Sequence, residues 1–169
     1  MEISDSKNSK SKRRGNIYNR IKDLLLLEGV SFRELHHAPT RTSEESAKAR
    51  GESLKIGGKC LILKVDKDFK AFVLSAEKRI DSVKIKKQFK AKKIRFATPD
   101  ELMNTVGLVP GSIPPFGPPI MPFPLYIDKS IIKNEKIAFN AGSLTDSIIM
   151  STEDYLKVSD AKIFEFSKS

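Results

Sequence analysis

The chain has 169 residues, of which 39% are hydrophobic and 31% charged, a composition that suits one globular domain with its own core. No apolar run approaches the roughly 20 residues that a membrane-spanning helix needs. One cysteine and two histidines exclude an internal disulfide and leave too few ligands for a thiolate or histidine-rich metal site. We therefore expect a cytoplasmic protein without a metal, another cofactor or a membrane partner.

The net charge is strongly positive, at +10, because 31 lysines and arginines outnumber 21 aspartates and glutamates. Such an excess is typical of proteins with a polyanionic partner, nucleic acid first. Residues 84–95, KIKKQFKAKKIR, hold seven basic side chains and no acidic one. This basic segment is either a footprint for nucleic-acid phosphates or a solvated face, and we expect the former. The lysines expected to contact phosphates are Lys84, Lys86, Lys87, Lys90, Lys92 and Lys93.

The chain divides into a short tail and one domain. Residues 1–14 are polar and basic, which predicts a disordered tail. Residues 15–169 contain no internal repeat and no linker that would split them, so they are expected to form a single domain.

The helices are predicted from the helical spacing of apolar residues and from capping signals. Thr42 with Glu45 three residues later is a capping box, and Thr98 with Glu101 is another, in which Pro99 takes the first helical position. The helices expected from these signals cover residues 16–28, 42–51 and 81–89, with two more that begin near residues 98 and 152.

The strands are predicted from short apolar runs between turn signals. KCLILKV and KAFVLSA, residues 59–65 and 70–76, follow each other closely and predict a hairpin. The other strands are expected over residues 31–35, 93–97, 125–128, 136–142, 146–151 and 162–166. Together these elements predict an α+β domain with a mixed, mostly antiparallel, curled sheet of about seven strands and four or five helices.

Residues 107–124, GLVPGSIPPFGPPIMPFP, hold seven of the nine prolines and three of the nine glycines. Proline fixes φ and removes a backbone donor, whereas glycine permits positive φ and a close approach of the backbone to another group. Such a stiff loop suits the wall of a pocket, although it could equally cover the edge of a sheet.

Five motifs in order carry a resemblance to a known family: HAPTRTSEESAKARG, GGKCLILK, ATPDEL, GLVPGSIPPFG and FNAGSLTDSIIMSTEDYL. Together they resemble the YbaK/prolyl-tRNA-synthetase-associated domain family, over about residues 17–166. This family comprises freestanding aminoacyl-tRNA deacylases and the editing insertion of bacterial prolyl-tRNA synthetases. The resemblance implies the fold of that family and hydrolysis of the ester in a mischarged tRNA, without a metal.

The resemblance implies a catalytic role for Lys59, which begins an apolar strand after two glycines. A lysine in that position can hold a phosphate or an ester oxygen, or it can simply extend into solvent at a strand end. The glycine-x-x-x-proline motif of the family is matched by residues 111–115. It implies that the backbone N–H groups of Gly111 and Ser112 stabilise the oxyanion, and that the same wall sets the size of the pocket through Pro115, Phe116 and Gly117.

Two further segments are expected to contact the substrate. The turn in FNAGSLTDS offers small polar groups for ribose hydroxyls or the amino group, although Asp146 could merely cap the turn. The helix that begins near residue 42 could face the substrate with its positive N-terminus. The residues expected to bind substrate in these two segments are Thr42, Ser43, Asn140, Gly142, Ser143 and Asp146.

Two reactive side chains are expected to be structural. Cys60 follows Lys59 in an apolar strand, so alternation turns it away from the pocket and predicts a buried thiol. His37 matches a position where the family often has histidine, and we expect it to be structural.

The resemblance therefore implies a trans-editing hydrolase that removes a small amino acid, such as alanine or cysteine, from tRNA-Pro. The expected pocket supplies no obvious histidine or glutamate as a general base, and the resemblance implies that a ribose hydroxyl or the aminoacyl group of the substrate helps to activate the water. The partners expected are aminoacyl-tRNA and an aminoacyl-tRNA synthetase. The alternative is a non-catalytic module that binds tRNA or a synthetase with the same fold.

Overall fold

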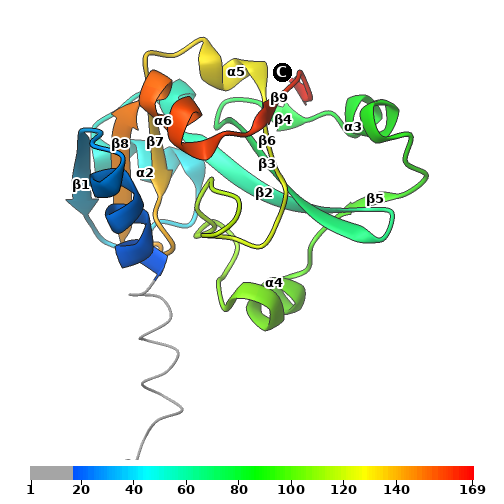
Figure 1. Cartoon of the computed structure of the whole chain (residues 1–169), viewed down its shortest axis with the longest axis horizontal. Coiled ribbons are helices and arrows are strands. Elements are labelled where there is room, and N and C mark those ends of the chain that lie inside the picture. Colours follow the sequence, from blue (N-terminus) through cyan, green and yellow to red (C-terminus); the bar gives the residue numbers. More distant parts are fainter. Residues whose placement is uncertain (1–16) are drawn as a thin grey trace, which may run out of the picture.

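The computed structural model describes residues 17–169, so the predicted tail over residues 1–14 lies outside the described residues. Helices and strands both contribute to the fold, which confirms the α+β class (Figure 1). The predicted first helix covers residues 17–27. The other helices are α2 Ser43–Arg50, the 3-10 helix η1 Leu54–Ile56, α3 Ser82–Phe89, α4 Pro99–Val106, α5 Lys129–Ile132 and α6 Thr152–Ser159.

Within the described residues the strands form three sheets, where the sequence predicted one curled sheet. The three-stranded sheet has the order β1-β8-β7, with β1 Phe32–His36, β8 Asp146–Ser151 and β7 Lys136–Asn140. The five-stranded sheet has the order β5-β2-β3-β6-β9. Its strands are β5 Ile94–Phe96, β2 Gly58–Val65, β3 Asp68–Ser75, β6 Leu125–Ile127 and β9 Lys162–Ile163. The remaining pair is β4 Arg79–Ile80 with β10 Ser167–Lys168.

The pairing is mixed and mostly antiparallel, as predicted. The β2–β3 hairpin pairs along its whole length, from Gly58 opposite Ser75 to Val65 opposite Asp68. The parallel pairs are β3 with β6 and β6 with β9. In Figure 1 the three-stranded sheet lies at one end of the molecule, and the hairpin extends from it toward α3 and β5 at the other end.

The capping signals place two helices as expected. The hydroxyl of Thr98 accepts from the N–H of Glu101, whose carboxylate accepts from the N–H of Thr98, a complete capping box. The hydroxyl of Thr42 accepts from the N–H of Glu45, but the Glu45 carboxylate accepts from the N–H of Arg41 instead, so that box is only half formed.

Gly58 allows the two large sheets to approach each other, and Gly57 lies close to the residue that follows β3. A Cβ on Gly58 would lie 2.5 Å from Cδ1 of Ile137 on β7, and one on Gly57 would lie 3.0 Å from Cβ of Ala76. At the first of these contacts a side chain would force Ile137 to shift. Gly58 therefore lets the start of β2 lie against β7, which sets the position of the lysine relative to the three-stranded sheet.

The main core fills the space between the first helix, the two larger sheets and the 107–124 loop. Ile21 and Leu25 of the first helix are fully buried in it, beside Phe139 of β7 and Tyr155 of α6. A second cluster around Phe72 and Phe166 lies under α3. None of the helices formed by residues 17–169 is both long and apolar enough to cross a membrane.

Candidate active site

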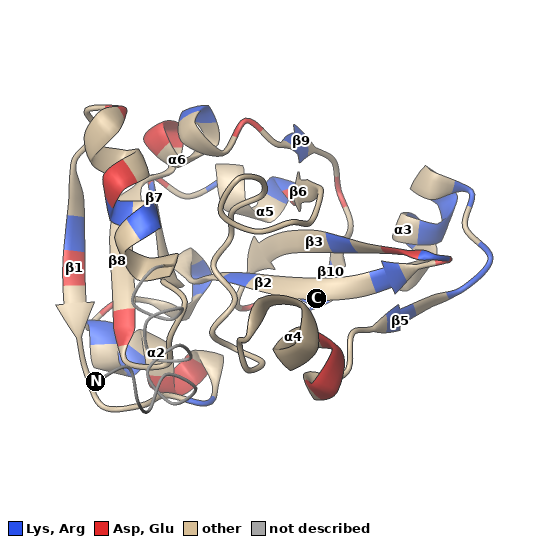
Figure 2. Ribbon diagram, turned by 60° about the horizontal axis from the view of Figure 1, so that its bottom comes forward, with Lys and Arg blue, Asp and Glu red and all other residues tan. Residues whose placement is uncertain are grey.

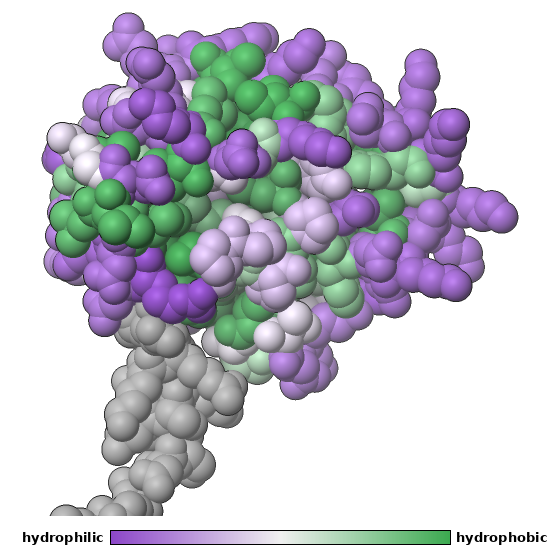
Figure 3. Space-filling model, viewed as in Figure 1, coloured by the Kyte–Doolittle hydropathy of each residue, from purple (hydrophilic) through white to green (hydrophobic). Residues whose placement is uncertain are grey.

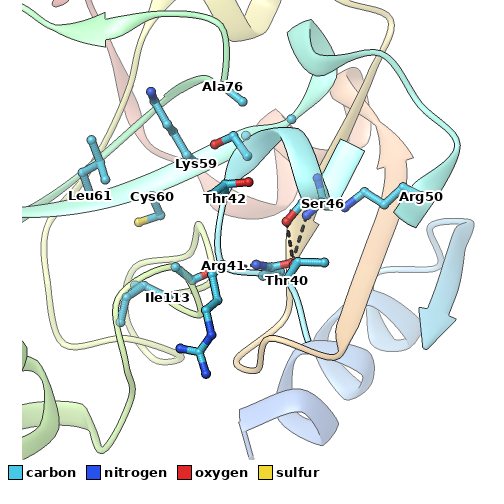
Figure 4. Close-up of a pocket in the computed structure, with 15 residues that line it drawn as sticks. Thr40, Arg41, Thr42, Ser46, Arg50, Lys59, Cys60, Leu61, Ala76 and Ile113 are labelled. Carbon is cyan, nitrogen blue, oxygen red and sulfur yellow. Dashed lines mark hydrogen bonds between the residues drawn. The ribbon is translucent and has the colours of Figure 1, made fainter. Parts of the chain in front are cut away.

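A cavity of about 150 Å³ lies where the start of α2, the start of β2, the 107–124 loop and the end of β7 meet (Figure 4). Five of the residues predicted to act on the substrate line it. These are Lys59, Thr42, Ser43, Gly111 and Asn140. The structure thus brings together residues from four separate segments of the chain.

Lys59 occupies the second position of β2, directly after the close contact at Gly58, and its side chain is half-buried. Desolvation lowers the pKa of its ammonium group, and the carboxylate of Glu44 on α2 partly opposes that shift. A cation that has lost part of its water and lines a cavity can interact strongly with an anionic or carbonyl oxygen.

The N-terminal end of α2 supplies hydroxyl groups to the cavity. Thr42 is the N-cap of this eight-residue helix, and Ser43 is its first residue. Thr40 and Ser46, both buried, share a hydrogen bond of 2.7 Å between their hydroxyl groups. The wall of the cavity on this side is therefore polar and small.

The 107–124 loop contributes Gly111, whose φ of +89° is strained for any residue with a side chain. Among the described residues no acceptor takes up the N–H of Gly111, so it is available to a ligand. Ser112 behaves differently: both its N–H and its hydroxyl donate to the carbonyl of Val109, at 3.1 and 2.7 Å. This donor is already engaged within the loop, and the role of Ser112 at the ester stays a prediction.

Residues 115–117, predicted to form the pocket wall, lie behind it. Phe116 is 2% exposed and packs edge-to-face on Phe139 and Tyr155. The carbonyl of Pro115 accepts from the hydroxyl of Tyr155, and Gly117 is buried against Leu125. These residues support the loop from the core side and do not line the cavity.

The turn between β7 and β8 borders a second cavity of about 550 Å³, which shares Arg41 with the first. Ser112, Gly142 and Ser143 line this second cavity. A Cβ on Gly142 would lie 2.8 Å from Cγ2 of Ile17, so this glycine lets the first helix pack closely. Asp146 accepts hydrogen bonds from Ser143 and Thr145 and contacts His36, which is the turn-capping role considered from the sequence.

Sequence reasoning missed Arg50, which also lines the first cavity. Its Nε donates to Oγ of Ser147 and its Nη2 donates to Oδ1 of Asn140, both at 3.0 Å. Burial lowers the pKa of this guanidinium to about 10. In the sequence it reads as a basic residue at a helix C-terminus, an ordinary partner of the helix dipole.

Cys60 and His37 were both expected to be structural. Cys60 is buried, as predicted, and burial raises the pKa of its thiol to about 12, so it is not a thiolate at neutral pH. Contrary to the alternation argument, Cys60 still lines the cavity. His37 donates through Nδ1 to the carbonyl of Ala38, and its Nε2 lies 2.8 Å from Oγ of Ser147.

The basic segment lies at the other end of the molecule, where Figure 2 shows lysine and arginine residues on α3, on β5 and between them. Lys86, Lys87, Lys90, Lys92 and Lys93 are exposed. Lys84 is instead half-buried, donates to the carbonyl of Ser167 and lies 3.6 Å from the carboxylate of Glu165. The space-filling view shows a hydrophilic surface at this end (Figure 3).

The described part of the chain holds no group of three or more histidine, cysteine, aspartate or glutamate side chains placed to bind a metal ion. The polar groups of the cavity are a lysine, two arginines, hydroxyls, a thiol, an amide and backbone. This set is suited to binding oxygen atoms of a substrate.

The family comparison agrees with this geometry. Residues 37–158 match the model of the aminoacyl-tRNA editing domain family, so the chain belongs to that family. The predicted resemblance, and with it the class of editing hydrolase, is confirmed at the level of the family.

Two relatives show the range of this similarity. The chain is 30% identical, over 159 residues, to the Multifunctional Ser/Thr-tRNA deacylase ProXp-y of Escherichia coli K12, covering 90% of this chain and 93% of that protein. It is 33% identical, over 101 residues, to the proline–tRNA ligase of Shouchella clausii, covering 60% of this chain and only 18% of the ligase.

Solved structures confirm the fold. The hypothetical protein APE2540 superposes with a TM-score of 0.78 at 22% identity, over 88% of this chain and 99% of that one. A protein described as a candidate trans-editing enzyme for prolyl-tRNA synthetase superposes with a TM-score of 0.76 at 24% identity, over 90% of this chain and 97% of that one.

Proposed function

We propose that this protein is a trans-editing enzyme that hydrolyses the ester bond of mischarged aminoacyl-tRNA. The observation that carries the proposal is the cavity that Lys59, the N-terminus of α2 and Gly111 line together, in a chain of the editing family. Residues 15–169 act as the single catalytic domain.

In the proposed reaction, water adds to the ester carbonyl and the bond from the carbonyl carbon to the ribose oxygen breaks. One proton of the water ends on that ribose oxygen, the amino acid leaves as a carboxylate, and the second proton is released to solvent. The ammonium of Lys59 and the N–H of Gly111 stabilise the negative charge that develops on the carbonyl oxygen. A ribose hydroxyl or the amino group of the substrate helps to activate the water.

We propose that the amino acid removed is small. A cavity of about 150 Å³ walled by Thr40 and Ser46 suits a short side chain. The sequence favoured alanine or cysteine on tRNA-Pro, and the name of the E. coli relative adds serine and threonine. A pocket of this kind separates such residues by only about 1–3 kcal/mol per methylene, so the substrate has to be found by experiment.

The exposed lysines of the basic segment are proposed to contact tRNA phosphates. These lysines lie at the end of the β2–β3 hairpin that is farther from the cavity, so they would bind a part of the tRNA away from its aminoacylated 3′ end. A synthetase is a further proposed partner, supported by the family's occurrence within proline–tRNA ligases.

The test is hydrolysis of tRNAs charged with alanine, cysteine, serine, threonine or proline, each on tRNA-Pro and on a second tRNA. Lys59→Ala should abolish hydrolysis, whereas Lys64→Ala, a control on the same strand, should retain it. If wild type binds tRNA at low salt but leaves every ester to decay at the uncatalysed rate, the proposal fails and the protein is a binding module.

A further inference from the structure

Arg50 is a partly buried cation for which the proposed mechanism has no use. Its hydrogen-bond partners are neutral: within the described residues, the side chains to which it donates are those of Ser147 and Asn140. Burying a charge without a carboxylate partner is costly. A cation held in this way therefore calls for an explanation beyond the stability of α2.

The hydrogen bonds of Arg50 lead directly to the 107–124 loop. Because the guanidinium can only donate, it fixes Oδ1 of Asn140 toward itself and turns the amide nitrogen outward. That nitrogen donates to the carbonyl of Gly111 at 2.7 Å. A chain of two hydrogen bonds thus connects the end of α2, through the end of β7, to the loop.

The peptide group between Gly111 and Ser112 is consequently held on both sides. Its carbonyl accepts from Asn140 and its N–H donates to the carbonyl of Val109. The ring of Pro110 restricts the backbone just before Gly111. With its neighbours fixed in this way, the N–H of Gly111 retains little freedom of direction.

We infer that Arg50 is a positioning residue, which acts through Asn140 to hold the N–H of Gly111 toward the cavity. The inference rests on the proposed function, in which that N–H stabilises the oxyanion. A donor fixed before the reaction begins needs no reorganisation when charge develops, so the loss of Arg50 should slow the chemical step more than it weakens substrate binding.

The kinetic test compares Arg50→Met, Arg50→Lys and Asn140→Asp with wild type and with Lys48→Met, which removes an exposed cation from the same helix. We expect both Arg50 variants to lose about 10- to 100-fold in kcat with little change in KM. Lysine keeps the charge but cannot donate to Ser147 and Asn140 in the fixed geometry of a guanidinium. Asn140→Asp can still accept from Arg50 but cannot donate to Gly111, and should lose activity equally.

A second readout is independent of activity. The backbone amide resonance of Gly111, followed by NMR, should shift in Arg50→Met and Asn140→Asp, and remain unchanged in Lys48→Met. An Arg50→Lys enzyme with wild-type kcat, or a Gly111 resonance unaffected by Arg50→Met, would overturn the inference. If wild type hydrolyses no ester, the proposed function fails, and the Gly111 resonance still tests the connection.

Discussion

The cationic side chains at the two ends of the molecule differ in their exposure to solvent. At the cavity, Lys59 and Arg50 are partly buried, and desolvation lowers the pKa of each. At the far end of the β2–β3 hairpin, five lysines of the basic segment extend into solvent. Few, partly desolvated cations suit recognition of a single oxygen in the reaction, whereas many exposed ones suit the diffuse charge of a nucleic-acid backbone.

The largest effect is expected on catalysis, from removing Lys59, the lysine of the cavity. Lys59→Ala should lower kcat about 100-fold or more, equivalent to about 3 kcal/mol of transition-state stabilisation, at any salt concentration. Single-turnover rates at saturating enzyme measure this loss. An effect confined to KM would place Lys59 with the binding lysines and remove the contrast.

The next-largest effect is expected on stability, from disturbing the close contact between Gly58 and Ile137. Gly58→Ala places a methyl group 2.5 Å from Cδ1 of Ile137, which is 1% exposed and cannot easily move. We expect a loss of about 1–3 kcal/mol in the free energy of unfolding, measured by urea denaturation. The double variant Gly58→Ala with Ile137→Val, in which the neighbouring side chain is shorter, should recover part of the lost free energy of unfolding. No recovery would mean that the contact with Ile137 does not cause the loss.

At the basic end, Lys86→Ala with Lys87→Ala should raise KM several-fold at moderate salt and leave kcat unchanged. The slope of log affinity against log salt should become shallower by about 0.7–0.9 for each phosphate that the variant no longer neutralises. The pair Lys157→Ala with Lys162→Ala removes two exposed lysines elsewhere and should change neither quantity. Equal slopes in the two double variants would show that the basic segment is only a solvated face.

The pH dependence should report the environment of Lys59. Its pKa in the folded protein lies below 10.5, so activity that needs the ammonium form should decline at a pH below that of an ordinary lysine. Glu44 raises this pKa, and Glu44→Gln should therefore move the alkaline decline to lower pH. Rates corrected for spontaneous ester hydrolysis test this; a decline that Glu44→Gln leaves in place would mean that another group titrates.

The smallest effect is expected at Cys60. Because burial holds its thiol protonated at neutral pH, Cys60→Ser should change kcat by no more than a few-fold, and iodoacetamide should modify the folded protein slowly. Rapid alkylation with loss of activity would instead indicate a reactive thiol in the cavity.

The sequence predicted the elements whose signals are local. Capping by Thr42 and Thr98 and the β2–β3 hairpin all follow from neighbouring residues. The predicted strand over residues 162–166 ends early, at Ile163, because buried Asp128 accepts from the N–H of Phe166 and the hydroxyl of Ser167. That carboxylate is distant in the sequence and leaves no periodic signal.

The site was predictable to the extent that it resembles its family. Lys59 and Gly111 line the cavity as expected, and their roles remain predictions. The bond from Ser112 to Val109 and the burial of Phe116 were not predicted, because a proline-rich segment does not reveal which of its groups bond to each other and which enter the core. Arg50 was missed because its partners, Asn140 and Ser147, lie on strands about ninety residues away.

The most direct test of the account is hydrolysis of a 3′-aminoacyl-adenosine, which carries the ester but none of the tRNA phosphates. If chemistry belongs to the cavity and tRNA binding to the basic segment, wild type and the Lys86→Ala with Lys87→Ala variant should cleave this small ester at the same rate, and Lys59→Ala should not cleave it. Loss of cleavage in the Lys86 and Lys87 variant, or cleavage retained in Lys59→Ala, would contradict the separation of the two ends.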